Sequence, residues 1–392
     1  MSSTHGSIIP DERLQALTDA EIDRYSRHLI LPDIGREGQK RLKAARVLVA
    51  GTGGLGAPAA LYLAAAGVGR IGLVDYDFVE VSNLQRQIIH GTKDIDRPKT
   101  ASAKDRIKNL NPHVDVVTHN TRLNSDNALD ILGAYDAVVD GTDNFPARYL
   151  LNDACVLLGI PDVYGSIFQF EGQAGVFYAR QGPCLRCLFP EPPPPGLVPS
   201  CGEGGVMGVL PGIIGSIQAC ETVKLIVGGG TGLIGRICSI DAWTMRFAQL
   251  RFDKDPACPV CGGQATVREL IDYELFCGLK QKDEIPVESI TARELKTRMD
   301  RGDPLQIIDI REPHERSMFA FPSAKAVPFG QLVRRREEFD PAVDAVFICK
   351  IGQRSVYAVR ALREAGYEGK MYNLSDGSNA WARDVDTALH QY

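Results

Sequence analysis

The sequence predicts an α/β protein with two domains, the first built on a doubly wound parallel sheet and the second smaller. Its 392 residues, 44% of them hydrophobic, are enough for two buried cores. Short apolar runs alternate with helical patterns, as they do where helices connect parallel strands. A glycine-rich turn follows the apolar run Arg46–Ala50, which is typical of a nucleotide-binding strand–turn–helix unit.

The first domain is expected over residues 18–262. Thr18-Asp-Ala-Glu21 is a capping box that starts a short amphipathic helix. Residues 190–212, which hold the proline run Pro192–Pro195, are expected to form a mobile surface crossing. The regular elements follow in order: a strand at 46–50, a helix at 57–66, and strands at 71–74 and 137–140.

The second domain is expected over residues 289–392, after a linker at 263–288. Thr291 caps a predicted helix, and the residues 307–310 and 345–349 have the apolar composition of buried strands. Gly366 closes a helix predicted at 354–365. The second half of the chain is thus an α/β domain of its own.

Charge and targeting signals exclude several classes of protein. The net charge is −5 and no basic run stands out, so we expect no nucleic-acid partner. The polar N-terminus lacks the apolar core of a signal peptide. Apolar stretches such as Ala57–Val68 contain glycine and proline and are too short to span a bilayer. We therefore expect a cytoplasmic protein that does not enter a membrane.

The turn after the first strand predicts a nucleotide site. Gly51, Gly53 and Gly56 fit the pattern G-x-G-x-x-G, Gly54 lies within the same turn, and Asp75 ends the next strand. Such glycines let phosphate approach the backbone at a helix N-terminus, and the acid bonds the ribose hydroxyls. This pattern alone does not separate NAD from ATP.

Polar residues farther along the chain favour ATP. Arg27, Arg86 and Lys99 supply three cations, which suit a triphosphate with about four negative charges. Further polar groups near predicted strand ends and loops are Asn83, Asp143 and Asn144. The alternative, an NAD-dependent oxidoreductase, leaves these residues unexplained.

These motifs together resemble one family. The residues 24–27, 51–56, 75–77, 82–87, 97–99 and 141–144 look like the MoeB/ThiF family of ubiquitin-activating-like adenylyltransferases, which have a Rossmann-like sheet. The resemblance implies ATP, Mg²⁺ and a small sulfur-carrier protein that ends in Gly-Gly. By position it implies that Asp75 binds ribose, that Asn83, Arg86 and Lys99 bind phosphates, and that Asp143 holds Mg²⁺. It also implies a homodimer in which Arg27 reaches the partner's site as an arginine finger.

Four cysteines predict a structural metal site. Cys184/Cys187 and Cys258/Cys261 form two Cys-x-x-Cys pairs, and four thiolates without an open position suit tetrahedral Zn²⁺. Zinc is also what the family resemblance implies. A redox dithiol is the alternative, but it gives the second pair no role.

Cys201 lies between these pairs in the glycine- and proline-rich segment. Its expected exposure suits a thiol that meets a partner's C-terminus, and we expect a catalytic role for it. In some relatives the corresponding cysteine links transiently to the carrier. Four other cysteines are expected to be packing residues: Cys155, Cys220, Cys238 and Cys277.

Cys349 has a different setting. It ends a predicted strand and opens the loop Cys349-Lys-Ile-Gly-Gln-Arg354 before a helix. Loop N–H groups, the helix N-terminus and the charges of Lys350 and Arg354 would favour a nucleophilic thiolate. Cysteine phosphatases also pair cysteine with arginine, but here only four residues separate the two, which we consider too tight for a phosphate.

The second domain is similar to rhodanese domains. The resemblance rests on Ile308-Asp-Ile-Arg311, on residues 349–355, and on Asp376-Gly-Ser-Asn-Ala-Trp381, while residues 320–324 depart from the usual pattern. It implies that Cys349 carries a persulfide. Thiosulfate or a cysteine desulfurase is then the expected sulfur donor.

The order of the two parts is similar to that of fused proteins of the MoeZ type. Such a chain is expected to adenylate the carrier and then to transfer sulfur to it, giving a thiocarboxylate, as in molybdenum cofactor synthesis. The remaining alternative is a module in which the rhodanese domain only docks a partner. In that case Cys349 would be inert.

Overall fold

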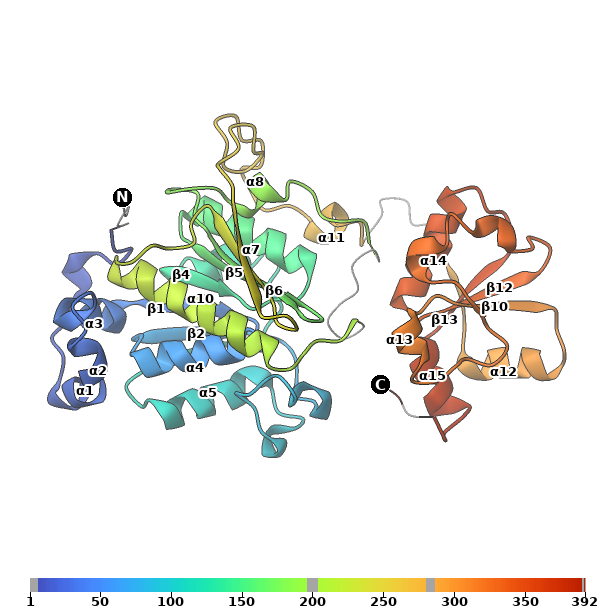
Figure 1. The fold of residues 1–392 in the computed structure, drawn as a ribbon, viewed down its shortest axis with the longest axis horizontal. Coiled ribbons are helices and arrows are strands. Elements are labelled where there is room, and N and C mark those ends of the chain that lie inside the picture. Colours follow the sequence, from blue (N-terminus) through green and yellow to red (C-terminus); the bar gives the residue numbers. More distant parts are fainter. Residues whose placement is uncertain (1–5, 196–203, 280–285, 390, 392) are drawn as a thin grey trace. The chain divides into compact units, whose positions relative to one another are not determined.

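The protein folds as two compact units, shown in the computed structural model in Figure 1. The structure describes residues 6–195, 204–279, 286–389 and 391. In this part of the chain the first unit runs to Pro192 and then continues from residue 204 to Cys277. The second unit includes everything described from Gly278 onward.

A mixed sheet of eight strands forms the centre of the first unit. Its order is β3-β2-β1-β4-β5-β6-β7-β8, in which β1 to β5 are parallel and β6 to β8 are antiparallel. The strand order reverses between β1 and β4, and ligands of such sheets bind at the carboxyl ends of the strands at this switch point. The strands are β1 (Arg46–Ala50), β2 (Arg70–Val74), β3 (Asp115–His119), β4 (Ala137–Asp140), β5 (Asp162–Phe168), β6 (Glu171–Phe177), β7 (Arg236–Asp241) and β8 (Arg246–Arg251).

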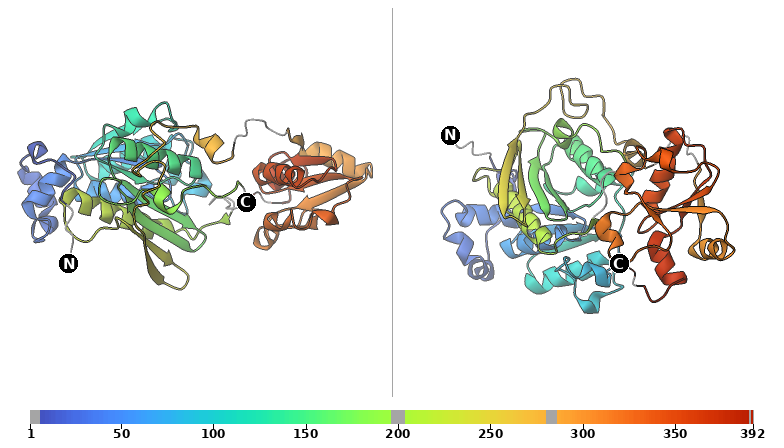
Figure 2. Two further views of the ribbon diagram at one scale, coloured as in Figure 1. Left: turned by 90° about the horizontal axis from the view of Figure 1, so that it is seen from above. Right: turned by 45° about the vertical axis from the view of Figure 1, so that its right-hand side comes forward.

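Helices cover both faces of this sheet (Figures 1 and 2). α4, α5 and α10 pack against one another on one face, and α6, α7 and α11 pack together on the other. The helices of this unit are α1 (Asp19–Arg24), α2 (Ser26–Leu29), α3 (Gly35–Ala44), α4 (Gly56–Ala66), α5 (Lys99–Leu110), α6 (Ala128–Leu132), α7 (Phe145–Leu158), α8 (Leu185–Leu188), α10 (Leu210–Val227) and α11 (Tyr273–Phe276). Short 3₁₀ turns lie at η1 (Asp11–Arg13), η2 (Val81–Asn83) and η3 (Thr92–Asp94).

The second unit is a parallel sheet of five strands in the order β11-β10-β12-β13-β9. Its strands are β9 (Glu288–Ile290), β10 (Leu305–Asp309), β11 (Lys325–Ala326), β12 (Asp344–Ile348) and β13 (Met371–Leu374). Its helices are α12 (Ala292–Asp300), α13 (Pro313–Arg316), α14 (Gln353–Glu364) and α15 (Gly377–Asp384), with 3₁₀ turns η4 (Phe329–Gln331) and η5 (Arg336–Glu338). Apolar residues on the two faces form two separate cores, one under α14 and one under α12 and α15.

The α/β prediction is confirmed, and both expected capping boxes are present at Thr18 and Thr291. Two expectations differ from the structure. The first half of the segment 263–288, expected as a linker, is folded onto the first unit, because α11 buries Tyr273 there. The expectation that no apolar stretch is long enough for a bilayer is wrong for α10, which has the required length and composition. α10 nevertheless packs as a core helix against α4, β5 and β6.

Candidate active sites and metal centre

The glycine turn between β1 and α4 lies at the predicted switch point. Gly51 has a left-handed backbone with φ +87°, and a Cβ there would lie 2.8 Å from the carbonyl oxygen of Gly141, just after β4. A Cβ on Gly56 would lie 1.9 Å from the Gly51 carbonyl oxygen. Only glycine fits these two positions, so the turn keeps its backbone at the edge where phosphates would bind.

Asp75 lies beside this turn, as predicted. Its Oδ2 accepts hydrogen bonds from the backbone N–H of Thr52 at 2.8 Å and from the Thr52 hydroxyl at 2.9 Å. Its Oδ1 accepts from the backbone N–H of Asp77 at 3.0 Å. The carboxylate is therefore held in place by the turn itself, which fixes its position for a ligand.

Two of the three predicted cations, Arg86 and Lys99, lie at the same edge of the sheet as the glycine turn. The Arg86 side chain lies over the turn, since its Cδ is 3.7 Å from where a Cβ on Gly54 would be. Its Nη1 donates to the Ser82 carbonyl at 3.1 Å. Lys99 begins α5, is only 7% exposed, and forms an ion pair with Asp77 at 2.7 Å. A phosphate that binds Lys99 at this edge would have to share the lysine with Asp77 or displace Asp77 from it.

Asn83 has a local structural role. Its Oδ1 accepts the backbone N–H of Glu80 at 3.2 Å, and its Nδ2 lies 3.5 Å from the Ser82 hydroxyl. These contacts cap the turn η2, and the side chain is nearly buried. Asn83 therefore shapes the segment that carries Arg86.

Asp143 and Asn144 follow β4 at the same edge. The Asn144 Oδ1 accepts the backbone N–H of Ala147 at 3.0 Å and so caps α7. The Asn144 Nδ2 lies 3.4 Å from the Asp143 Oδ1. Asp143 itself is exposed, and an exposed carboxylate at this edge would suit Mg²⁺ as a ligand.

Two buried carboxyl groups that the sequence analysis missed lie beneath this edge. The register pairs Val138 with Asp162, so the side chains of Asp140 and Asp162 share one face of the sheet. Asp140 Oδ1 accepts from the Thr142 N–H at 2.8 Å and from its hydroxyl at 2.6 Å. Burial raises the pKa of both carboxyls, and the charge of Asp140 raises the pKa of Asp162 further. No motif indicates this pair, because Asp162 becomes its partner only through strand pairing.

Arg27 is not part of this cluster within the chain. It lies exposed on α2, two residues after Tyr25. The Tyr25 ring packs at Gly67, which ends α4, since a Cβ on Gly67 would lie 2.5 Å from its Cζ. α4 starts at the glycine turn, so Arg27 lies at the opposite edge of the sheet, with α1 to α3 (Figure 1).

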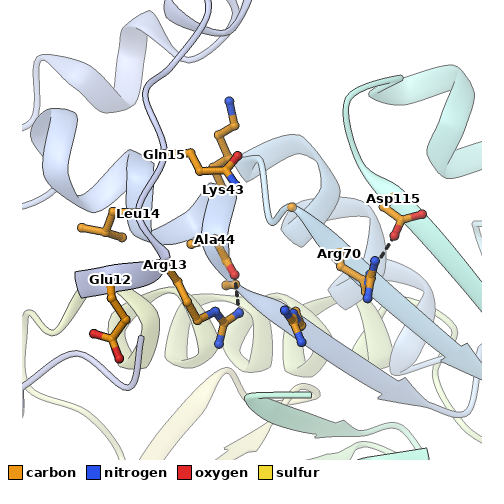
Figure 3. Close-up of a pocket in the computed structure, with 11 residues that line it drawn as sticks. Glu12, Arg13, Leu14, Gln15, Lys43, Ala44, Arg70 and Asp115 are labelled. Atoms are coloured by element: carbon orange, nitrogen blue, oxygen red, sulfur yellow. Dashed lines mark hydrogen bonds and ion pairs between the residues drawn. The ribbon is translucent and has the colours of Figure 1, made fainter. Parts of the chain in front are cut away.

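A cavity of about 330 Å³ lies at this opposite edge (Figure 3). Arg13, Lys43 and Arg70 line it, but each is already paired with a carboxylate: with Asp136, Glu21 and Asp115, respectively. Its position at the amino ends of β1 and β2 separates it from the glycine turn. It is therefore not the predicted nucleotide site.

The four predicted metal ligands come together in the structure. The Sγ atoms of Cys184, Cys187, Cys258 and Cys261 all lie within 4.8 Å of one another. Individual separations are 3.9 Å for Cys184–Cys187, 3.6 Å for Cys184–Cys258 and 3.4 Å for Cys187–Cys261. Four thiolates about 2.3 Å from a tetrahedral zinc ion are roughly 3.8 Å apart, so this donor set fits Zn²⁺.

A buried ion pair supports the metal centre. Arg186, between two of the cysteines, donates to Asp153 on α7 at 3.0 Å and 2.7 Å. The Tyr273 hydroxyl of α11 donates to the same carboxylate at 2.8 Å. The guanidinium also lies 4.2 Å from the ring centre of Phe276. No sequence motif predicts this network, because its members lie on three separate segments.

Cys349 lies at the carboxyl end of β12, as predicted, and has no exposed surface. Its Sγ accepts the Gly352 backbone N–H at 3.1 Å and lies 3.4 Å from the Ser355 hydroxyl oxygen in the first turn of α14. Gly352 adopts φ +84°, in the left-handed region that favours glycine. The loop thus presents a hydrogen-bond donor to the sulfur.

Arg354, whose positive charge was expected to act on Cys349, is paired with a carboxylate. Its guanidinium forms a buried ion pair with Glu315 of α13, at 2.9 Å and 2.5 Å. Although burial alone would raise the pKa of Glu315, the bonds and charge of Arg354 lower it. Arg354 therefore connects α14 to α13. The negative charge of Glu315 offsets its positive charge and so weakens its effect on the thiol.

The other cysteines divide into three groups. Cys201 lies outside the described residues. Cys155 and Cys277 are buried and Cys238 is partly buried, in keeping with packing roles. Cys220 is exposed on α10, so its expected role as a packing residue is wrong.

Comparisons with known proteins agree with this arrangement. The ThiF family matches residues 25–260, and the rhodanese-like domain matches residues 291–384. "Probable adenylyltransferase/sulfurtransferase MoeZ" of Mycobacterium tuberculosis is 46% identical over 391 residues, covering 97% of this chain and 98% of that protein. "Adenylyltransferase and sulfurtransferase MOCS3" of Culex quinquefasciatus is 43% identical, covering 96% and 90%.

Two further comparisons concern the first unit. "Sulfur carrier protein adenylyltransferase" of Thermus thermophilus is 54% identical over 268 residues, covering 67% of this chain and 99% of that protein. Among solved structures, E. coli MccB matches with a TM-score of 0.56 at 21% identity, covering 65% of this chain and 77% of that one. At this identity the match supports the fold alone.

The fold and its sites define an ATP-using enzyme that joins an adenylyltransferase to a sulfurtransferase. The main interpretation of the sequence is thus confirmed over the oxidoreductase alternative. The chain belongs to the ThiF family and carries a rhodanese-like domain after its ThiF part.

Proposed function

We propose that the first unit adenylates the C-terminal Gly-Gly of a small sulfur-carrier protein and that Cys349 then supplies sulfur to it. One observation carries the proposal. A single chain holds a glycine turn flanked by Arg86, Lys99 and Asp143, and also a cysteine whose sulfur accepts a loop N–H. The first set suits phosphoryl transfer and the second suits a sulfur nucleophile.

The adenylation step needs positioning and charge neutralisation. The carrier's terminal carboxylate attacks the α-phosphorus, the bond to the bridging oxygen breaks, and pyrophosphate leaves with the electron pair. The backbone of Gly51–Gly56 approaches the phosphates, Arg86 and Lys99 oppose their charge, and Asp75 binds the ribose. Asp143, with Asn144 beside it, would hold Mg²⁺, which neutralises phosphate charge when bound.

The sulfur step uses Cys349 as a carrier of one sulfur atom. A Cys349 persulfide attacks the acyl carbon, AMP leaves, and an acyl disulfide forms. A second thiolate then attacks the Cys349 sulfur, which releases the thiocarboxylate and leaves a disulfide. We assign this second thiolate to Cys201. Because Cys349 is fully buried, its loop has to move before a donor or the adenylate can reach it.

The remaining parts of the proposal concern partners and setting. The chain acts as a cytoplasmic homodimer, in which Arg27 completes the partner's adenylation site. Thiosulfate or a cysteine desulfurase loads Cys349. The thiocarboxylate product suits the sulfur demand of molybdenum cofactor synthesis and of related thiolations. Support comes from a relative named "Sulfur carrier protein adenylyltransferase" and from the position of Arg27 away from its own glycine turn.

The direct test is mass spectrometry of candidate diglycine-tailed carriers incubated with the enzyme, ATP, Mg²⁺ and thiosulfate. The expected result is a mass gain equal to the exchange of one oxygen atom for sulfur. Loss of this product in Cys349→Ser, with adenylation intact, would separate the two steps. If Cys349→Ser still forms thiocarboxylate, the second domain only docks a partner.

Asp143→Ala should abolish carrier-dependent ATP–pyrophosphate exchange, with a loss of at least about 100-fold, because electrostatic stabilisation carries this step. Asp130→Ala, which removes an exposed carboxylate from α6 in the same unit, should leave the exchange unchanged. Normal exchange in Asp143→Ala would show that Asp143 has no part in adenylation.

The zinc assignment is tested by metal analysis. Purified protein should hold about one zinc ion per chain, and Cys258→Ser should lose it, since three thiolates leave the tetrahedral site incomplete. Cys238→Ser, outside the cluster, is the control and should keep the ion. A zinc content well below one per chain in the unaltered protein would remove the assignment.

A further inference from the structure

Ser355 is a hydroxyl with more acceptors than protons. Its Oγ lies 2.6 Å from Asn373 Oδ1, 3.1 Å from the Gly352 carbonyl oxygen and 3.4 Å from the Cys349 sulfur. A serine hydroxyl has one proton to donate and two lone pairs. The shortest of these contacts is the hydrogen bond that the Ser355 hydroxyl donates to the Asn373 Oδ1.

The side chain of Asn373 is held so that its amide oxygen accepts this hydrogen bond. Asn373 lies on β13 and is 6% exposed, while Ser355 is fully buried. The Asn373 Nδ2 lies 3.3 Å from the Ser289 hydroxyl on β9, and this contact turns the amide oxygen toward Ser355. The chain Cys349–Ser355–Asn373–Ser289 thus runs from the reactive sulfur to the surface.

While the Ser355 hydroxyl donates its hydrogen bond to Asn373, the lone pairs of its oxygen face the Cys349 sulfur. That arrangement matches a protonated thiol, whose S–H can donate to the Ser355 oxygen. A thiolate or persulfide accepts only, so the hydroxyl then has to rotate toward the sulfur. This rotation leaves the buried Asn373 Oδ1 without its partner, which carries a free-energy penalty.

Three arginines on the elements around the cysteine are paired with carboxylates. Arg354 pairs with Glu315, Arg311 with Asp309, and Arg383 with Asp376. Lys350, next to Cys349, makes contacts of its own. The neutral relay is therefore well placed to decide the protonation state of the sulfur.

We propose that Asn373 is a positioning residue for sulfur transfer, which acts through Ser355 to favour the resting thiol of Cys349 over the thiolate. Loading with sulfur turns the Ser355 hydroxyl from Asn373 to the sulfur. This inference rests on the proposed role of Cys349 as the sulfur carrier.

The reaction of the full-length protein with thiosulfate tests the relay. The Cys349 thiolate attacks the outer sulfur of thiosulfate, the S–S bond breaks, and sulfite leaves with the electron pair. The rate of sulfite release is measured against pH, which gives the midpoint of thiolate formation and the plateau rate at high pH.

The two single variants should move this midpoint in opposite directions. Asn373→Leu removes the competing acceptor and should lower the midpoint by about one pH unit, with the plateau rate retained. Ser355→Ala removes the donor for the thiolate and should raise it. The double variant should match Ser355→Ala, because Asn373 acts only through Ser355.

Three controls complete the design. Thr297→Ala, which removes an exposed hydroxyl of α12 that donates to the Arg293 carbonyl, should leave the midpoint unchanged. Asn373→Val offers a second side chain without an acceptor, suited to a strand, if the leucine variant does not fold. Cys349→Ser should release no sulfite; if it does, the proposed role of Cys349 fails and this inference with it.

An unchanged midpoint in both Asn373 variants, with Cys349→Ser inactive, would overturn the relay while leaving the proposed function intact. A midpoint that falls or stays in Ser355→Ala would also overturn it, because the hydroxyl would then not donate to the thiolate. A further shift in the double variant would show that Asn373 acts by another route.

Discussion

Asp162 has a buried carboxyl group to which the proposed adenylation mechanism assigns no role. Its carboxyl shares a sheet face with Asp140 and is 1% exposed, and among the described atoms no hydrogen-bond partner reaches its Oδ1. Burial, together with the charge of Asp140, raises its pKa well above the usual range. Asp140, in turn, holds the Thr142 turn that leads to Asp143.

The sign of the pH dependence follows from this raised pKa. Above the pKa of an unfolded aspartate, about 3.9, the folded state keeps a proton that the unfolded state loses. The stability of the fold therefore falls as pH rises from there toward the folded pKa. Asp162→Asn removes this proton uptake and should therefore make the stability of the fold less dependent on pH.

Asp162→Asn should stabilise the protein more at pH 8 than at pH 5. A gain of about 1 kcal/mol would raise the melting temperature by roughly 2–4 °C for a unit of this size. Thermal unfolding at the two pH values measures it, with Asp130→Asn as the exposed control. Equal shifts at both pH values would mean that the carboxyl is ionised in the fold.

Elements whose signals are local could be predicted from the sequence. The capping boxes at Thr18 and Thr291 and the glycine turn at Gly51 need only neighbouring residues, and all are present. β8 carried no signal, because all six of its positions are exposed. α11 could not be predicted either, since its anchor, Asp153, is 120 residues away.

The same distinction holds within the sites. Cys349 and its loop are contiguous, so the cysteine could be found from the sequence. Asn373, Glu315 and Asp162 reach their partners only through strand pairing or helix packing. Sequence motifs therefore indicated the groups that we propose as reactive, whereas the groups that orient them could be found only from the fold.

α11 is expected to depend on one hydrogen bond. Tyr273→Phe removes the donor to the buried Asp153, a bond to a charged group of the kind that contributes about 1.5–3 kcal/mol. Faster amide hydrogen exchange in residues 271–277 should result, while zinc content stays unchanged. Glu274→Gln is the matched control in the same helix, because the Glu274–Arg122 pair is more exposed. Unchanged exchange in Tyr273→Phe would contradict an anchoring role.

The adenylation machinery is incomplete within one chain if Arg27 belongs to it. Arg86, Lys99 and Asp143 gather at the carboxyl edge of the sheet, whereas Arg27 lies at the opposite edge. A two-fold dimer can resolve this, because each partner then supplies its Arg27 to the other's site. Such an arrangement makes a definite prediction about mixtures of inactive variants.

Arg27→Ala and Asp143→Ala should each be inactive alone and should restore activity when mixed and allowed to exchange subunits. In a mixed dimer the Arg27→Ala chain keeps its own Asp143 and receives Arg27 from its partner, so one of the two sites is complete. Random pairing in equal amounts then gives about a quarter of the activity of the unaltered dimer. Carrier-dependent ATP–pyrophosphate exchange measures it, with each variant mixed with itself as the control. If the mixture stays inactive although subunits exchange, Arg27 acts within its own chain or not at all, and the glycine-turn edge has to neutralise the triphosphate with Arg86 and Lys99 alone.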